Sequence, residues 1–142
     1  MCIRDRSGSS NITIHVEPKY DISTTIQKIK ESGISLGLAI NPETSIEAAQ
    51  PFLSQIDILL VMTVVPGFGG QKFMDEETMP KVREAAKIRK ENNLNFNIQV
   101  DGGITATTAK IAAKNGANIM VAGTNTFRAT DMRLAIDELR NA

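Results

Sequence analysis

The sequence has very little of what disulfide scaffolds and metal centres are built from. Its 142 residues include one cysteine, Cys2, and one histidine, His15. A single cysteine excludes a disulfide framework and a cysteine-based zinc site within the chain. A single histidine excludes a metal site with several histidines made by this chain alone. A reducing, cytoplasmic setting is therefore the expected one.

Excess charge and long apolar runs are also missing. The chain has 16 Lys and Arg residues against 16 Asp and Glu residues, so no positive surplus points to nucleic acid or an acidic membrane surface. No apolar run approaches the roughly 20 residues of a membrane span. The first ten residues lack the apolar middle of a secretory signal. We expect a soluble, cytoplasmic protein with no nucleic-acid or membrane partner.

The first residues differ from the rest of the chain. MCIRDR, residues 1–6, is charged and aperiodic, and it resembles a translated sequencing-adapter end. A disordered native terminus is the alternative. We expect residues 1–10 to be a non-native or disordered extension. Residues 11–142 then form one domain, which is long enough to bury a core.

From residue 11 onward, strand and helix patterns alternate five times. Alternating or continuous apolar residues predict strands at 11–17, 35–40, 56–62, 95–100 and 118–123. Helical spacing and cap residues predict helices at 21–33, at 45–55 with a break at Pro51, from Thr78 onward, at 105–116 and at 131–139. This order indicates an α/β fold with a parallel sheet. The pattern leaves two architectures open, a doubly wound sheet or part of an eight-stranded barrel.

Glycine-bearing loops follow three successive predicted strands. They contain PGFGG, DGG and AGT, which supply Gly67, Phe68, Gly69 and Gly70, then Asp101, Gly102 and Gly103, then Gly123 and Thr124. The carboxyl ends of parallel strands lie on one face, where ligands bind. Backbone N–H groups without a Cβ nearby can approach a phosphate. Each loop taken singly could be a simple turn, and GFGG lacks the third glycine of a dinucleotide fingerprint.

Asp101 is the best catalytic candidate because it ends a predicted buried strand where the backbone opens. A carboxylate at that point can bind a metal, transfer a proton or cap a helix. The cap is the least favoured of the three roles, because Thr105 already serves the following helix.

Four other residues remain ambiguous. His15 could reach the same face, although a lone histidine is more often a hydrogen-bonded wall residue, and Glu17 is similar. Met62 could line the pocket or pack in the core. Lys72 could meet a phosphate, although a single loop lysine is usually solvated.

Several of these segments together resemble the ribulose-phosphate 3-epimerase family. The resemblance rests on LVMTVVPGFGGQKF, VDGGIT and ANIMVAGTNTFR, with GLAINPETSIE and ITIHVE upstream, and it runs from about Asn11 to the C-terminus. It implies a partial (β/α)₈ TIM barrel containing the fourth to eighth strands. It also implies an isomerase that inverts C3 of D-ribulose 5-phosphate to give D-xylulose 5-phosphate in the pentose phosphate pathway.

The resemblance also implies roles for particular residues. Asp101 matches the family's second aspartate, a proton donor and a ligand of a divalent metal, usually zinc, with iron, manganese or cobalt as substitutes. Met62 matches a methionine that lines the cavity, and Thr124 stands where the family usually has serine. The implied substrate contacts are Gly67, Phe68, Gly69, Gly70, Asp101, Gly102, Gly103, Gly123 and Thr124.

Other parts of the family pattern are absent from the sequence. The other aspartate, two metal-binding histidines and a substrate-contacting serine belong to the first three strands, and His15 does not match a metal histidine. We therefore expect the chain to lack epimerase activity and to bind metal poorly, with a phosphosugar as its small-molecule partner. The full-length protein is expected to be a homo-oligomer. An allulose-6-phosphate 3-epimerase and a non-catalytic phosphosugar-binding fragment remain alternatives.

Overall fold

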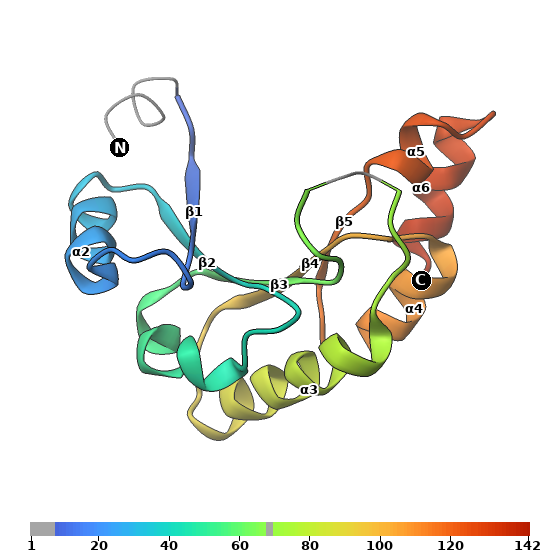
Figure 1. Ribbon diagram of the computed structural model, residues 1–142. Coiled ribbons are helices and arrows are strands. Elements are labelled where there is room, and N and C mark those ends of the chain that lie inside the picture. Colours follow the sequence, from blue (N-terminus) through green and yellow to red (C-terminus); the bar gives the residue numbers. More distant parts are fainter. Residues whose placement is uncertain (1–7, 68–69) are drawn as a thin grey trace.

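All five predicted strands form one parallel sheet. The computed structural model describes residues 8–67 and 70–142 (Figure 1). The strands are β1 (Asn11–His15), β2 (Ser35–Ile40), β3 (Ile58–Met62), β4 (Asn97–Asp101) and β5 (Ile119–Val121). They pair in the order β1-β2-β3-β4-β5. A doubly wound sheet reverses its strand order at a switch point, so this consecutive order is that of a barrel-type arrangement.

Helical segments follow each strand. They are α2 (Ile22–Glu31), η1 (Ile46–Ala48), η2 (Gln50–Gln55), α3 (Asp75–Glu91), α4 (Ala106–Lys114), α5 (Thr124–Phe127) and α6 (Met132–Arg140). The predicted caps of α2, α4 and α6 are confirmed, because the side chains of Asp21, Thr105 and Asp131 each accept a hydrogen bond from a backbone N–H of the first turn. None of the described helices is long and apolar enough to cross a membrane.

Two helix predictions differ from the structure. The 45–55 segment forms two short 3₁₀ helices, and Pro51 lies at the start of the second one, where its missing N–H removes no hydrogen bond. The long helix begins at Asp75 and not at Thr78, whose N–H donates to the Met74 carbonyl in the first turn (3.1 Å). Three acidic residues in that turn favour the earlier start, because carboxylates stabilise a helix N-terminus.

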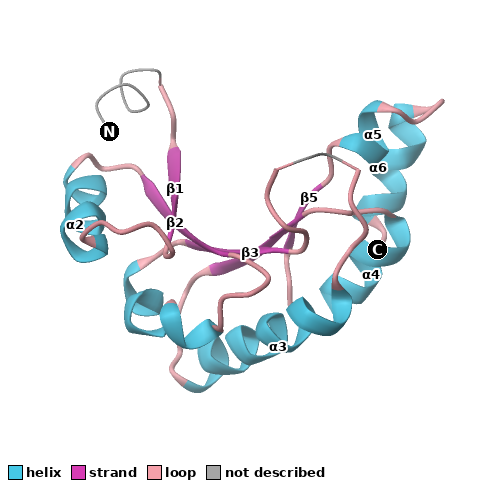
Figure 2. Cartoon of the chain, viewed as in Figure 1, coloured by secondary structure: helices cyan, strands magenta, loops and turns pink. Residues whose placement is uncertain are grey.

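The two faces of the sheet have different roles. Leu38, Leu59 and Ile98 share a register row and are fully buried in the core beneath the helices. Figure 2 shows α2, α3 and α4 along the outer, convex side of the curved sheet. The next residues along the strands point to the inner side, where the partly exposed Gln99 and Asp101 lie. The site therefore forms on the inner face and at the carboxyl ends of the strands.

Opposite charges fix the carboxyl end of β2. The Glu17 carboxylate accepts hydrogen bonds from the Asn41 backbone N–H (2.7 Å), the Thr44 hydroxyl (2.6 Å) and His15 Nδ1 (3.1 Å). From the other side, Lys81 Nζ of α3 donates to the Asn41 carbonyl (3.2 Å). Burial alone would raise the pKa of Glu17, but the hydrogen bonds outweigh it and lower that pKa. The ends of β1 and β2 are thus tied to α3.

The lowered pKa of Glu17 predicts a pH-dependent contribution to stability. A carboxylate with a depressed folded-state pKa stabilises the fold above its unfolded pKa of about 4.3, and this stability is lost as pH falls through the folded value. We expect Glu17→Gln to lower the free energy of unfolding by about 1 kcal/mol at pH 7, a figure discounted for the partial exposure of the carboxylate. The difference from the unmodified chain should shrink below pH 4.

Urea unfolding at several pH values measures this difference. Glu43→Gln is the matched control, because Glu43 is exposed in the same turn, and it should change stability little at any pH. A Glu17→Gln deficit that stays constant from pH 7 to pH 3.5 would show that ionisation of Glu17 is not its cause.

Candidate functional site

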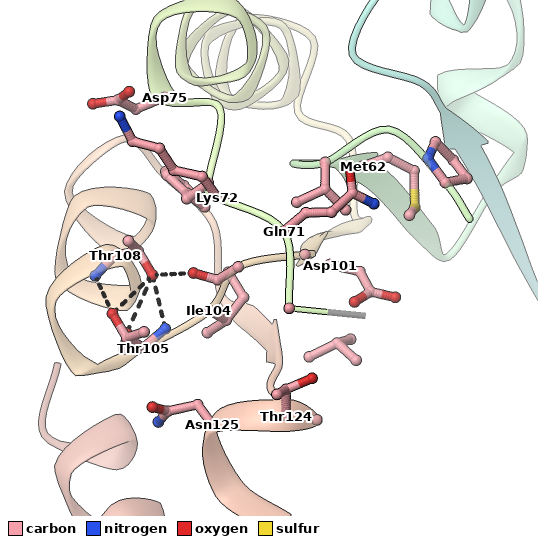
Figure 3. Close-up of a pocket in the computed structure, with 18 of the residues that line it drawn as sticks. Met62, Gln71, Lys72, Asp75, Asp101, Ile104, Thr105, Thr108, Thr124 and Asn125 are labelled. Carbon is pink, nitrogen blue, oxygen red and sulfur yellow. Dashed lines mark hydrogen bonds between the residues drawn. The ribbon is translucent and has the colours of Figure 1, made fainter. Parts of the chain in front are cut away.

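A cavity of about 970 Å³ opens at the carboxyl ends of β3, β4 and β5 (Figure 3). Each of the three glycine-bearing loops contributes to its wall. The predicted site residues that line it are Met62, Gly67, Gly70, Asp101, Gly102, Gly103, Gly123 and Thr124. The fold thus brings together residues that lie up to 62 positions apart in the sequence, from Met62 to Thr124.

Some candidates fall elsewhere. Phe68 and Gly69 lie outside the described residues. Lys72 lines the cavity, and its side chain extends toward Asp75, at the end away from Asp101 (Figure 3). His15 and Glu17 are not among the described residues that form the wall; they belong to the network at the end of β1. The catalytic and binding roles of the lining residues stay predictions.

Strand register places Asp101 in the cavity wall. Met62, Asp101 and Val121 form one row across β3, β4 and β5, so their side chains share the inner face. Among the described residues, no group donates a hydrogen bond to the Asp101 carboxylate, which faces the cavity (Figure 3). Burial raises the pKa of this carboxyl above its ordinary value. Asp101 is therefore suited to carry a proton nearer neutral pH than an exposed aspartate.

The loop after β3 packs closely against Gly102 and Gly103 in the loop after β4, and neither glycine has space for a side chain. Gly102 (φ 121°) and Gly103 (φ 65°) both adopt a backbone conformation that favours glycine. A Cβ on Gly102 would lie 2.4 Å from a Val64 methyl group, and one on Gly103 would lie 2.6 Å from the Phe73 backbone nitrogen. Close packing between the two loops thus requires both glycines of DGG.

Thr63 supports the site from outside the cavity wall, and the sequence patterns did not single it out. It is fully buried, its N–H donates to the Asp101 carbonyl (2.8 Å), and its hydroxyl donates to the Gly102 carbonyl (2.6 Å). A signal for it was available, since a lone hydroxyl residue directly after the apolar strand must find a buried partner.

The described residues do not form a complete metal site. No group of three or more His, Cys, Asp and Glu side chains among them is placed to hold a metal ion. Asp101 offers one carboxylate, whereas a catalytic zinc site uses about three protein ligands. The other carboxylates that line the cavity, Asp75 and Glu76, belong to the start of α3, and Figure 3 shows Asp75 far from Asp101.

Fold and site together define a parallel α/β protein of the TIM-barrel type with a ligand cavity at the carboxyl ends of its strands. Solved structures agree with this class. A 3-hexulose-6-phosphate synthase from Salmonella typhimurium superposes with a TM-score of 0.69 at 19% identity, over 96% of this chain and 62% of that one. A tryptophan synthase α-subunit from Pyrococcus furiosus superposes with a TM-score of 0.70 at 15% identity, over 98% of this chain and 58% of that one. Such low identity supports the fold alone.

Sequence comparison identifies the family. Residues 5–127 match the ribulose-phosphate 3-epimerase family. The ribulose-phosphate 3-epimerase of Bacillus subtilis is 36% identical over 138 residues, which are 96% of this chain and 63% of the relative. The ribulose-phosphate 3-epimerase of Candida glabrata is 44% identical over 126 residues, which are 89% of this chain and 49% of the relative. The chain belongs to the ribulose-phosphate 3-epimerase family, and it spans about half to three-fifths of the length of these relatives.

The loop packing predicts that alanine is poorly tolerated at two glycines. Gly102→Ala and Gly103→Ala each add a Cβ in contact with a neighbour and force an unfavourable φ, so each should lower the free energy of unfolding by about 3 kcal/mol. Gly123→Ala is the control, because a Cβ there meets nothing within 4 Å and its φ is −93°. We expect it to change stability by less than about 0.5 kcal/mol. Equal losses for all three variants in urea unfolding would contradict the packing argument.

Asp101 is predicted to reduce the stability of the fold at neutral pH. Its raised folded-state pKa means that the folded protein binds the proton more tightly than the unfolded chain does. The free energy of unfolding therefore rises as pH falls through the folded-state pKa. In EDTA at pH 7, Asp101→Asn should raise the melting temperature by about 2 °C, and it should flatten the dependence on pH between 4 and 7.

Asp75→Asn provides a comparison of opposite sign. Asp75 lies in the first turn of α3, where a carboxylate is favourable, so its replacement should lower the melting temperature. Calorimetry of both variants checks the pair. A lower melting temperature for Asp101→Asn would show that the Asp101 charge does not destabilise the fold.

Proposed function

We propose that this chain supplies the phosphate-binding part and one proton-transfer carboxylate of a ribulose-phosphate 3-epimerase. The reaction inverts C3 of D-ribulose 5-phosphate to give D-xylulose 5-phosphate. The observation that carries the proposal is the position of Asp101, a carboxyl with a raised pKa on the wall of a cavity that three glycine-bearing loops surround. Family membership supports the same substrate and reaction.

In this proposal, β1 to β5 are the fourth to eighth strands of an eight-stranded barrel. The parallel pairing in consecutive order and the curvature of the sheet support it (Figure 1). So does the likeness to solved TIM-barrel-type structures, of which the chain covers roughly three-fifths. The cavity then lies at the carboxyl face, where enzymes of this fold bind their substrates.

Different residues of the cavity bind the phosphate and transfer the proton. Backbone N–H groups of the glycine-bearing loops and the Thr124 hydroxyl hold the phosphate, which fixes the sugar against the β4 end. Asp101 exchanges a proton with C3 on one face of the sugar, and its raised pKa matches this task. Inversion requires a second acid/base group on the opposite face, because one carboxylate cannot reach both.

A divalent metal, most often zinc in the resemblance, remains a proposal for the assembled enzyme. Asp101 would contribute one ligand to it, and the described residues do not supply the others. We propose that the chain alone binds zinc weakly. Cytoplasmic location and assembly of the full-length protein into homo-oligomers stay predictions.

The second candidate is a phosphosugar-binding module without catalysis. One observation favours it for the chain as it stands, namely that Asp101 is the only carboxylate of the described cavity wall outside α3. Both candidates require the same phosphate contacts, so they differ in turnover and not in binding.

Binding and turnover of ribulose 5-phosphate by the purified chain test the proposal. NMR titration should show binding that weakens at least about fivefold in Thr124→Val, because the hydroxyl contact to the phosphate is lost. Asp101→Asn, which leaves that contact intact, is the matched control. We expect no measurable formation of xylulose 5-phosphate. No binding by the unmodified chain would overturn the proposal, whereas turnover that Asp101→Asn abolishes would support the activity and refute the expected inactivity of the chain.

A further inference from the structure

We propose that Thr63 is a positioning residue that couples the glycine loop, here its described residues 63–67 and 70–74, to Asp101. Contact of a ligand with the glycine loop would then act on the backbone that carries the carboxylate. The inference rests on the proposed function only in giving Asp101 its role in proton transfer. The coupling itself is a property of two loops that can be measured without turnover.

Thr63 connects both loops through three hydrogen bonds. Its N–H donates to the Asp101 carbonyl (2.8 Å) and its hydroxyl to the Gly102 carbonyl (2.6 Å), so it holds two successive carbonyls of the loop after β4. Its own carbonyl accepts from the Met74 N–H (2.9 Å) at the far end of the glycine loop. The Thr63 side chain is fully buried, so water does not replace its hydrogen-bond partners in the folded protein.

The Thr63–Met74 bond closes the neck of the glycine loop. A second connection lies further out, where Gln71 Nε2 donates to the Val65 carbonyl (2.6 Å). The two ends of the loop therefore behave as a paired unit. A displacement at Gly70 or Gln71, both of which line the cavity, reaches Thr63 through these connections.

Close packing connects the neck of the glycine loop to the loop after β4. Val64 follows Thr63, and Phe73 precedes Met74. Val64 contacts Gly102 and Phe73 contacts Gly103 so closely that no Cβ fits on either glycine. Well-packed contacts of this kind transmit small shifts because interiors resist compression. The Asp101 backbone is thus held by Thr63 from one side, and the glycines after it are held by the loop neck.

The hydroxyl of Thr63 distinguishes coupling from ordinary strand pairing. The N–H bond to Asp101 continues the β3–β4 ladder and any residue could make it. The bond to Gly102 requires a side-chain hydroxyl. Valine matches threonine in shape and removes only this bond, whereas serine keeps the hydroxyl. The two replacements therefore separate the loss of the bond from the loss of packing.

Amide hydrogen exchange of the unliganded chain tests the connection directly. In Thr63→Val, the exchange rates of the amides of residues 63 and 74 should rise at least about tenfold. The exchange rates of the Leu38 and Leu59 amides in the sheet core should change only with global stability. Thr63→Ser should restore protection at both positions. Thr13→Val is the matched control, because it removes a partly buried hydroxyl on the same sheet without touching the glycine loop. Protection at Met74 that is unchanged in Thr63→Val would overturn the proposal.

Titration with inorganic phosphate tests the transmission. In the unmodified chain and in Thr63→Ser, the amide resonances of Gln71 and Asp101 should shift with a common dissociation constant. In Thr63→Val, the shift at Asp101 should fall at least about threefold while Gln71 still responds. Equal responses at Asp101 in all three proteins would refute the transmission. If phosphate does not bind the unmodified chain, the phosphate site of the proposed function fails, and the exchange experiment still decides the coupling.

Discussion

Close packing between two loops is the constraint on which the candidate site depends. The ends of the glycine loop pack against Gly102 and Gly103, and neither glycine has room for a side chain. Thr63 is bonded to both loops from a buried position. Strand register places the Asp101 side chain on the inner face, and this contact holds the backbone directly after it.

The opposite half of the sheet is organised by charge. Glu17 and Lys81 bind the two sides of the Asn41 backbone. Glu17 lies just after β1 and Lys81 lies in α3, far away in the sequence. Since α3 begins where the glycine loop ends, this network fixes the helix to which the loop is attached. Polar contacts near the strand ends thus support the site through residues that are not among those of the described cavity wall.

The charge of Asp101 is expected to cost stability at neutral pH. Asp101 is partly buried without a hydrogen-bond donor among the described residues, and its pKa is raised as a result. A structural carboxylate such as Glu17 shows the reverse, with several donors and a lowered pKa. The contrast separates a partly buried carboxyl without donors among the described residues from one whose charge the fold stabilises with hydrogen bonds.

Local patterns in the chain were sufficient for the strands, for most helix caps and for the three loops that surround the cavity, because each depends on neighbouring residues. The start of α3 was misplaced, since Thr78 is a good cap residue but the acidic turn before it already favours the helix. Local patterns could indicate that Thr63 needs a buried partner, but they could not identify the partners of Thr63 or the contacts of Glu17 and Lys81 with Asn41. These interactions are contacts between segments about 20 to 40 positions apart, and such contacts exist only once strand register and packing have brought the loops together.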